Sequence, residues 1–431
     1  MALQRLTDWL EPQRLLVLAQ ETGFLRRKAR KLTPLLFVQA TVLLVSQSVG
    51  SFRRWAVLVG VLGQLCLSKQ ALWERINPRA VAFLQAVLAQ VLHRRLARAR
   101  PVSAAALATF PRVLIQDSTT LKLSPKLATA FPGSRNQCGA AHGQLKIQSL
   151  YDLQAQRFVT FSLSGFNRND QAAAPDVLAV ARAGDLVLRD LGYFVLATFQ
   201  QIAHAGAFFL SRLRLDTNLR DARTGQPLDL LGILQRQGHL DREVWLGEAQ
   251  LPVRVVAVKL PAAVAAERRR KAKQNRDQRW RPSARHLALL GWAIFVTNVS
   301  RKIWSAQTVA QVYGLRWRIE TIFKAWKSHF RLTEVPGGAA AQLEAMIYAR
   351  LIFVTVFAQT CAGAAAYSGH VAAPPQSLLQ WAGLIGDFFL VLCLEAWRRP
   401  LHASFGRQLD YHGRYERRRR KNFGETLMNL S

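Results

Sequence analysis

The stretch YGLRWRIETIFKAWK, residues 313–327, decides how the rest of the chain is interpreted. At about 100° per residue, a helix over this stretch places Tyr313, Arg316, Glu320 and Lys327 on one face. The opposite face gathers apolar side chains, namely Ile319, Ile322, Phe323, Trp326 and Phe330. We therefore predict one amphipathic helix whose polar face sets a carboxylate among cations and a phenol. That arrangement suits an acidic metal ligand beside phosphate-binding groups.

An ordinary surface helix explains the same pattern. Arg316 with Glu320, and Glu320 with Lys324, are i,i+4 ion pairs of the kind that usually decorate a solvated face. The spacing Tyr-x2-Arg-x3-Glu-x6-Lys favours a functional interpretation, because it resembles the YREK signature of the insertion sequence 4 family of bacterial transposases. In that family the glutamate completes an Asp, Asp, Glu metal-binding triad. The resemblance therefore implies two aspartates upstream.

Two upstream aspartates have matching surroundings. Residues 112–121 are rich in branched side chains and predict a strand that carries Asp117. Residues 185–190 predict a short buried strand that ends in Asp190, and Asp190-Leu-Gly-Tyr193 matches the family pattern around its second aspartate. A solvent-facing or turn position is the commoner fate of an aspartate, although an unpaired carboxylate in an apolar strand is costly. The rival candidates are Asp152, Asp170 and Asp185.

The order of predicted elements indicates an α/β fold with an RNase H-like mixed-sheet core. Strands at 145–153 and 157–165 are expected to pair antiparallel, and a helix at 175–183 precedes the strand at 185–190. Taken together with the resemblance, which implies a β-rich insertion between the second aspartate and the glutamate, this order predicts five regions: a helical DNA-binding domain (1–105), the first part of the catalytic core (106–214), the β-rich insertion (215–290), the second part of the core with the YREK helix (291–335), and a C-terminal helical region with a basic tail (336–431).

Charge indicates the partner. Lys and Arg outnumber Asp and Glu by 59 to 26, for a net charge of +33, so nucleic acid is the leading partner and an anionic membrane surface its competitor. The uncharged stretches 32–52 and 351–386 are interrupted by polar residues or prolines, and we predict core helices there and no membrane partner. Four or five short helices are expected before residue 100, one of them capped by Ser68, with a basic run at 94–100.

The insertion is also basic. It holds strand-like runs at 242–248 and 253–260, followed by a basic block at 268–276 and then Trp280. A charge run is usually a solvated face, but in so basic a chain we favour a surface that follows the DNA backbone. The four cysteines form no CxxC pair, and no secretory signal is present. We expect a cytoplasmic, nucleoid-associated bacterial protein.

The predicted function is that of a DDE transposase, with Asp117, Asp190 and Glu320 as catalytic ligands of two Mg²⁺ ions, which Mn²⁺ can replace. By resemblance, Tyr313, Arg316 and Lys327 hold DNA phosphates near the transposon terminus. The expected partners are double-stranded DNA, as terminal inverted repeats and as target, and a second copy of the chain in a homodimeric synaptic complex. A non-catalytic DNA-binding relic and an RNase H-like nuclease without strand transfer stay as alternatives.

Some relatives pass through a hairpin DNA end and flip a base onto a tryptophan. Trp245 and Trp292 are the nominees for such a role, and a place in the core explains either residue equally well.

Overall fold

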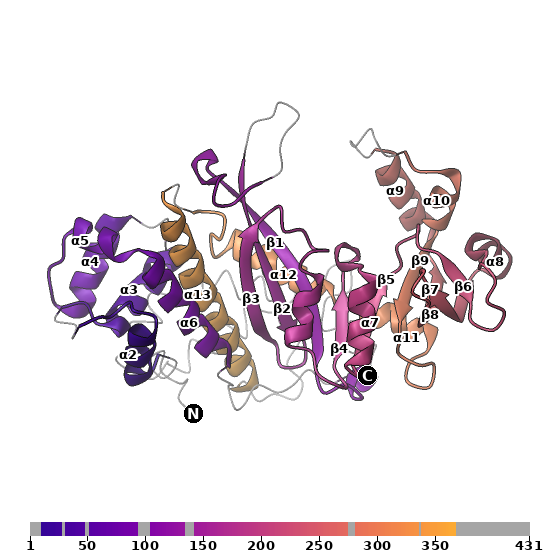
Figure 1. Ribbon diagram of the computed structural model, residues 1–431, viewed down its shortest axis with the longest axis horizontal. Helices are drawn as coiled ribbons and strands as arrows, with labels where there is room; N and C mark the ends of the chain where they lie inside the picture. The colour runs from indigo at the N-terminus through magenta and orange to yellow at the C-terminus, as the bar shows by residue number, and fades with distance from the viewer. Residues whose placement is uncertain are drawn as a thin grey trace. The chain divides into compact units, whose positions relative to one another are not determined.

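The computed structural model describes residues 10–27, 31–47, 51–93, 104–133, 142–274, 281–335 and 338–367. The chain divides into two compact units. Among the described residues, the first unit takes those up to 93, those within 118–168 and those from 318 onward, and the second takes those within 104–117 and 169–317. Figure 1 shows the helices and strands of the described residues.

The first unit contains the N-terminal helices (Figure 1), which are α2 (Pro12–Glu21), α3 (Pro34–Gln47), α4 (Phe52–Gly63), α5 (Lys69–Arg75) and α6 (Pro78–His93). The long helix α13 (Ala340–Tyr367) packs against α3 and α6. The Ser68 hydroxyl accepts a hydrogen bond from the Ala71 amide at 3.1 Å, which confirms the predicted cap of α5. The basic run at 94–100 and the basic tail lie outside the described residues.

The same unit contains strands β2 (Gly143–Asp152) and β3 (Arg157–Gly165), which pair antiparallel as predicted. Strand β1 (Val113–Leu123) is shared, because its residues from Ser118 onward belong to this unit and its earlier residues to the second. Helix α12 (Trp317–Ser328) buries the predicted apolar face, with the Trp326 ring 4.9 Å from that of Phe158. The short 3₁₀ helix η2 (Pro125–Leu127) follows β1.

In the second unit, the sheet continues from β1 through β4 (Leu186–Arg189), β5 (Phe208–Arg212), β9 (Trp292–Thr297), β8 (Leu251–Lys259), β7 (Leu240–Leu246) and β6 (Leu219–Asp221). Strands β4 and β5 run parallel to β1, and the pairs from β5–β9 to β7–β6 are antiparallel. The strand order β3-β2-β1-β4-β5 is that of an RNase H-like core, which confirms the predicted fold class. The insertion adds β6, β7 and β8 beyond β9, where two of these strands match the predicted runs.

The helical elements of this unit are η1 (Ala105–Leu107), η3 (Ala174–Ala179), η4 (Leu191–Tyr193), α7 (Leu196–His204), α8 (Leu230–Gln237), α9 (Ala262–Lys273), α10 (Ala284–Leu289) and α11 (Ala306–Gly314). The predicted helix at 175–183 is only the six-residue 3₁₀ helix η3. None of the helices in the described ranges is long and apolar enough to cross a membrane.

The prediction of one continuous signature helix is wrong. Helix α11 ends at Gly314, residues 315 and 316 form a turn, and α12 begins at Trp317. The Leu315 amide donates to Val312 at 3.0 Å and the Arg316 amide to Tyr313 at 3.1 Å, so the bonds here span three residues instead of four. A turn tightened in this way advances by more than 100° per residue. The spacing of 100° per residue therefore does not apply across this turn, so it does not place Tyr313 and Arg316 on one helix face with Glu320.

Candidate active site

Asp117 and Asp190 are brought together by two adjacent parallel strands. Gln116 of β1 and Arg189 of β4 are in register, so the aspartate that follows each of them lies beside the other. A single guanidinium contacts both carboxylates: Arg316 Nη1 is 3.0 Å from Asp117 Oδ2, and Arg316 Nη2 is 3.6 Å from Asp190 Oδ1. The two acids therefore converge on one centre of positive charge.

Tyr313 completes this group. Its hydroxyl lies 3.5 Å from Asp190 Oδ1, and its ring lies 5.8 Å from the Arg316 guanidinium and 5.1 Å from the Phe295 ring. Burial raises the pKa of Tyr313 to about 12, against the opposing effect of the Arg316 charge. The phenol is therefore neutral at physiological pH, and it donates its proton toward Asp190.

A buried polar layer fixes β1 and β4 at the residues that come directly before the two aspartates. Gln116 Nε2 donates to the Ala173 carbonyl at 2.9 Å, and Arg189 Nη2 donates to the Ala174 carbonyl at 3.0 Å. Because successive residues of a strand point to opposite faces, this layer lies across the sheet from the acids. Arg189 has no exposed surface, and burial lowers its pKa to about 9, which leaves it charged at neutral pH.

Aromatic rings surround the Arg189 guanidinium, at 5.7 Å for Tyr193 and 5.3 Å for Phe199. Tyr193 also packs against Ala173 and Ala174, the same residues whose carbonyls accept the two hydrogen bonds. A Cβ at Gly192 would lie 3.1 Å from Asp170 Oδ2, so a side chain there would crowd that carboxylate. The Asp190-Leu-Gly-Tyr193 pattern thus has a local structural reason beyond its acid.

Two of the rival aspartates have structural roles. Asp185 accepts hydrogen bonds from Arg112 at 2.5 and 3.0 Å and from the Arg182 amide at 2.7 Å. In the first unit, Asp152 Oδ1 accepts from the amides of the β2–β3 turn, those of Gln154 and Ala155, both at 3.1 Å.

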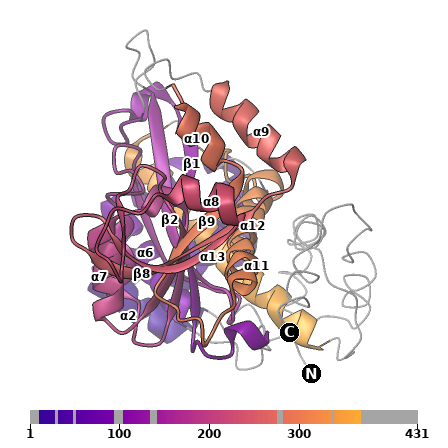
Figure 2. The same ribbon diagram turned by 90° about the vertical axis from the view of Figure 1, so that its right-hand side faces the viewer.

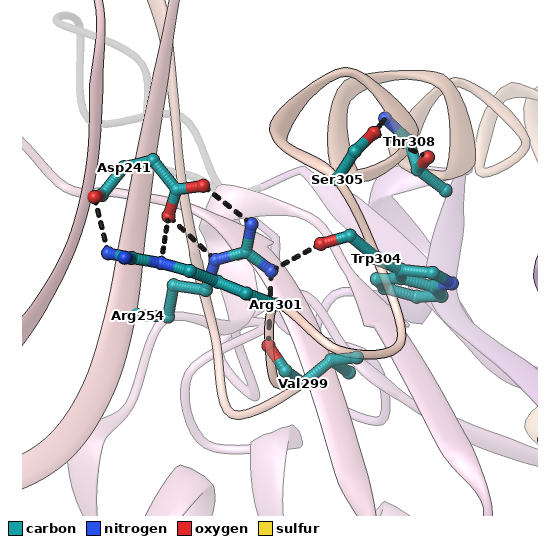
Figure 3. A network of polar contacts seen from close by, with 7 residues as sticks. All are labelled: Asp241, Arg254, Val299, Arg301, Trp304, Ser305 and Thr308. Carbon is teal, nitrogen blue, oxygen red and sulfur yellow. Dashed lines mark hydrogen bonds and ion pairs between the residues drawn. The ribbon is translucent and has the colours of Figure 1, made fainter.

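A second polar network fixes the start of α11 (Figure 3). Asp241 of β7 lies between two arginines, with Arg254 Nη2 at 2.7 Å and Arg301 Nε at 3.1 Å. Arg254 Nη1 donates to the Trp304 carbonyl at 2.8 Å, and the next residue, Ser305, caps α11 through the Thr308 amide. The insertion strands β7 and β8 therefore hold the segment that leads to Tyr313 and Arg316.

Glu320 and Lys327 lie on α12, in the part of that helix that belongs to the first unit. Glu320 is in the first turn, four residues after Arg316. Lys327 is in the last turn, where desolvation lowers its pKa. Of the six predicted site residues, the second unit by itself brings together Asp117, Asp190, Tyr313 and Arg316.

The donor chemistry fits a divalent cation. Two carboxylates on neighbouring strands already share one positive group, and carboxylate oxygens are the ligands that Mg²⁺ prefers. Within the described residues of the second unit, no third His, Cys, Asp or Glu side chain joins this pair in a metal-binding group.

Sequence reasoning did not single out Trp317, whose exposed fraction is 60% and which directly follows Arg316. Trp317 is not among the residues of the apolar face of the signature stretch, and this position could have indicated an exposed tryptophan. Of the two nominees, Trp292 donates its indole N–H to the Gly238 carbonyl at 2.9 Å, which is a structural contact. Trp245 lies in β7, paired with Arg220 and Pro252.

The sheet has the strand order of an RNase H-like core, and two of its adjacent parallel strands bring together Asp117, within β1, and Asp190, directly after β4. Residues 108–355 match the family described as "Transposase DDE domain", and the chain belongs to this family. It is a transposase, and neither the relic nor the stand-alone nuclease is favoured.

Several curated transposases are similar to this chain. It is 31% identical over 376 residues to the transposase for insertion sequence element IS231C of Bacillus thuringiensis subsp. berliner, covering 81% of this chain and 77% of the relative. It is 30% identical over 382 residues to the transposase for insertion sequence element IS231B of the same organism, and the match covers 83% of this chain and 79% of the relative. The transposase for IS1151 of Clostridium perfringens is 23% identical over 387 residues, covering 84% and 81%.

Proposed function

We propose that Asp117, Asp190 and Glu320 are the acidic triad of this transposase, and that they hold two Mg²⁺ ions, or Mn²⁺ in their place. The observation that carries the proposal is the shared guanidinium, because Arg316 contacts both aspartates and stands four residues before Glu320. The membership in the DDE transposase family, whose members normally use a divalent metal, supports the same assignment.

When bound, the ions neutralise charge at phosphorus, assist the oxygen nucleophile and stabilise the leaving oxygen. The chain's own groups prepare the site for this. The layer of Gln116 and Arg189 fixes β1 and β4 directly before the two acids, so that Asp117 and Asp190 are held in place before substrate arrives. The neutral Tyr313 phenol orients Asp190, and Arg316 keeps the two negative carboxylates together.

The reaction that this site supports is cleavage of the phosphodiester at each transposon end by water, followed by attack of the freed 3′-hydroxyl on target DNA. The substrates are therefore terminal inverted repeats and target duplex. Tyr313, Arg316 and Lys327 are proposed to hold phosphates near the terminus, Arg316 through its planar fork and Lys327 as a point charge. The net charge of +33 suits such a polyanion.

Further parts of the proposal rest on the sequence resemblance. They are membership in the insertion sequence 4 group, a homodimer in the synaptic complex, and a cytoplasmic, nucleoid-associated location.

The test is Glu320→Gln with duplexes that carry the element's own terminal repeats, in the presence of Mg²⁺. We expect end binding to survive and strand cleavage to be lost, while the control Glu248→Gln, which changes an exposed carboxylate of the insertion, keeps both. Joined products from the unmodified protein support the proposal. Nicked ends alone would indicate a nuclease, an intact shifted duplex would indicate a relic, and cleavage by Glu320→Gln would refute the triad.

A further inference from the structure

The Arg316 guanidinium lies between the two acids of the second unit. Its Nη1 is 3.0 Å from Asp117 Oδ2, and its Nη2 is 3.6 Å from Asp190 Oδ1. The Tyr313 ring lies 5.8 Å from the guanidinium, and the Arg316 side chain is only 8% exposed. The Asp190 side chain, by contrast, is 42% exposed. Solvent therefore reaches the acidic pair at Asp190, while a cation of the protein itself lies between the two carboxylates.

A divalent cation shared by the two acids needs the position that this guanidinium takes. In a hydrogen bond as long as the one between Arg316 Nη1 and Asp117 Oδ2, the hydrogen lies roughly 2 Å from the oxygen. Mg²⁺ binds carboxylate oxygens at about 2.0–2.1 Å, which is nearly the same distance. An ion that bridges Asp117 and Asp190 would therefore meet the guanidinium hydrogens between them.

Charge leads to the same conclusion as space. Two neighbouring carboxylates repel each other, so the pair of Asp117 and Asp190 is stabilised by a positive group between them. Arg316 supplies one positive charge there, and a divalent ion supplies two. A guanidinium and an ion held together between the same carboxylates would repel each other strongly, because Coulomb energy grows as the distance between charges falls. Either cation satisfies the pair, and each one opposes the other.

The backbone that carries Arg316 is held in place, so only the side chain needs to move. Helix α11, which ends two residues before Arg316, packs against β5, β8 and β9 (Figures 1 and 2). The Arg316 amide donates to the Tyr313 carbonyl at 3.1 Å. Arginine has a long stem with many rotamers, so rotation about its side-chain bonds is enough to withdraw the guanidinium from the two acids.

We propose that Arg316 is an internal competitor of the divalent cation: its guanidinium holds Asp117 and Asp190 together until an ion displaces it from between them. The inference rests on the proposed function, since it takes both aspartates as ligands of the ion. It also sets an order of events, because Arg316 becomes available to DNA only after the ion has taken its place. One residue thereby couples the loading of the ion to the binding of DNA.

The test measures Mn²⁺ binding to the full chain without DNA. Free Mn²⁺ gives an electron paramagnetic resonance signal that is lost when the ion binds, so a titration gives a dissociation constant that does not depend on cleavage. Arg316→Gln removes the guanidinium. Arg316→Met also removes the charge but keeps an apolar stem, and it is the second variant if Arg316→Gln fails to fold.

Arg212→Gln is the matched control, because it removes the same charge from the same unit. Arg212 of β5 is the cross-strand partner of Phe295, whose ring lies 5.1 Å from the Tyr313 ring. Among the residues that the structure describes, no hydrogen bond or ion pair joins Arg212 to Asp117 or Asp190. The control therefore separates direct competition for the acids from a general change in charge.

We expect Arg316→Gln to bind Mn²⁺ about tenfold more tightly than the parent, within the range of about 5- to 150-fold that is typical of coupled binding. Arg212→Gln should change the dissociation constant by about twofold or less in about 0.15 M salt, because salt screens charges that make no direct contact. Adding Asp190→Asn to Arg316→Gln should remove the gain, because the acidic pair for which the two cations compete is then lost.

A dissociation constant for Arg316→Gln equal to or weaker than that of the parent would overturn the inference. A gain that survives Asp190→Asn, or an equal gain in Arg212→Gln, would overturn it as well. If the gain appears as expected while the parent never cleaves terminal-repeat duplexes in Mg²⁺, the competition stands and the proposed catalytic function fails. If the parent cleaves and joins these duplexes while Arg316→Gln gains nothing, the proposed function stands and the competition fails.

Discussion

Replacing Arg254 with methionine should destabilise the second unit by about 3 kcal/mol. Arg254 is 3% exposed, bonds both oxygens of Asp241 and donates to the Trp304 carbonyl. Losing a donor to a buried carbonyl costs roughly 1–3 kcal/mol, and hydrogen bonds between charged groups contribute about 1.5–3 kcal/mol. The apolar stem of methionine recovers part of this by burial. Asp241 keeps Arg301 at 3.1 Å, so its charge is not left without a partner and the larger cost of a stranded buried ion does not apply.

Arg301→Met is the matched control, because Arg301 binds the same carboxylate but is 53% exposed. Exposed ion pairs contribute about 0.2–1 kcal/mol. Thermal unfolding followed by circular dichroism should therefore show Tm lowered by roughly 6–12 °C in Arg254→Met and by no more than about 4 °C in the control. Well below both midpoints, end cleavage should fall in Arg254→Met alone, because the start of α11 is no longer held. Equal losses of Tm in the two variants would refute the reasoning.

Two further predictions concern charges of the same unit. Burial alone would raise the pKa of Asp241, but Arg254 and Arg301 outweigh burial and hold that pKa below its usual range. The ion pairs of Asp241 therefore stabilise the folded state at pH values above the unfolded pKa of about 3.9, and this stabilisation is lost as the pH falls through the lower pKa of the folded state. Urea midpoints of the parent and Asp241→Asn should therefore converge below about pH 4, and a constant gap down to about pH 2 would contradict this. Arg316→Lys should lower strand cleavage on the order of 100-fold, because lysine lacks the fork that contacts both aspartates, and unchanged strand transfer would count against this role.

Local patterns predicted the elements that carry the acids. Asp117 in a branched strand and Asp190 at the end of a short apolar strand were both found from a few neighbouring residues, since strand propensity and burial are local signals. The break after Gly314 was missed because the apolar periodicity of the signature continues across a turn whose hydrogen bonds differ by one residue. Helical spacing alone does not distinguish one continuous helix from two helices joined by a short turn.

What the sequence could not predict depends on register. The layer formed by Gln116 and Arg189 exists because residues 73 positions apart pair across β1 and β4, and neither residue carries a recognisable motif. Arginine is rarely buried, so the burial of Arg189 was not expected from the sequence. Its hydrogen bond to the Ala174 carbonyl and its contacts with the Tyr193 and Phe199 rings stabilise the charge there. Likewise, the packing of α9 directs Arg268 toward the Trp292 carbonyl of β9 and leaves Arg270 exposed, so the basic block looked uniform only in the sequence.

The insertion and the signature are mechanically linked through one strand. Phe295 of β9 pairs on one side with Arg212 of β5 and on the other with Val256 of β8, and its ring supports Tyr313. Any shift of β8 therefore changes the position of the residue on which Tyr313 rests, in addition to loosening the Arg254 contact with Trp304. Because close-packed interiors transmit such shifts instead of absorbing them, substitutions in β8 should alter the cleavage of terminal-repeat duplexes even though β8 carries none of the six predicted site residues.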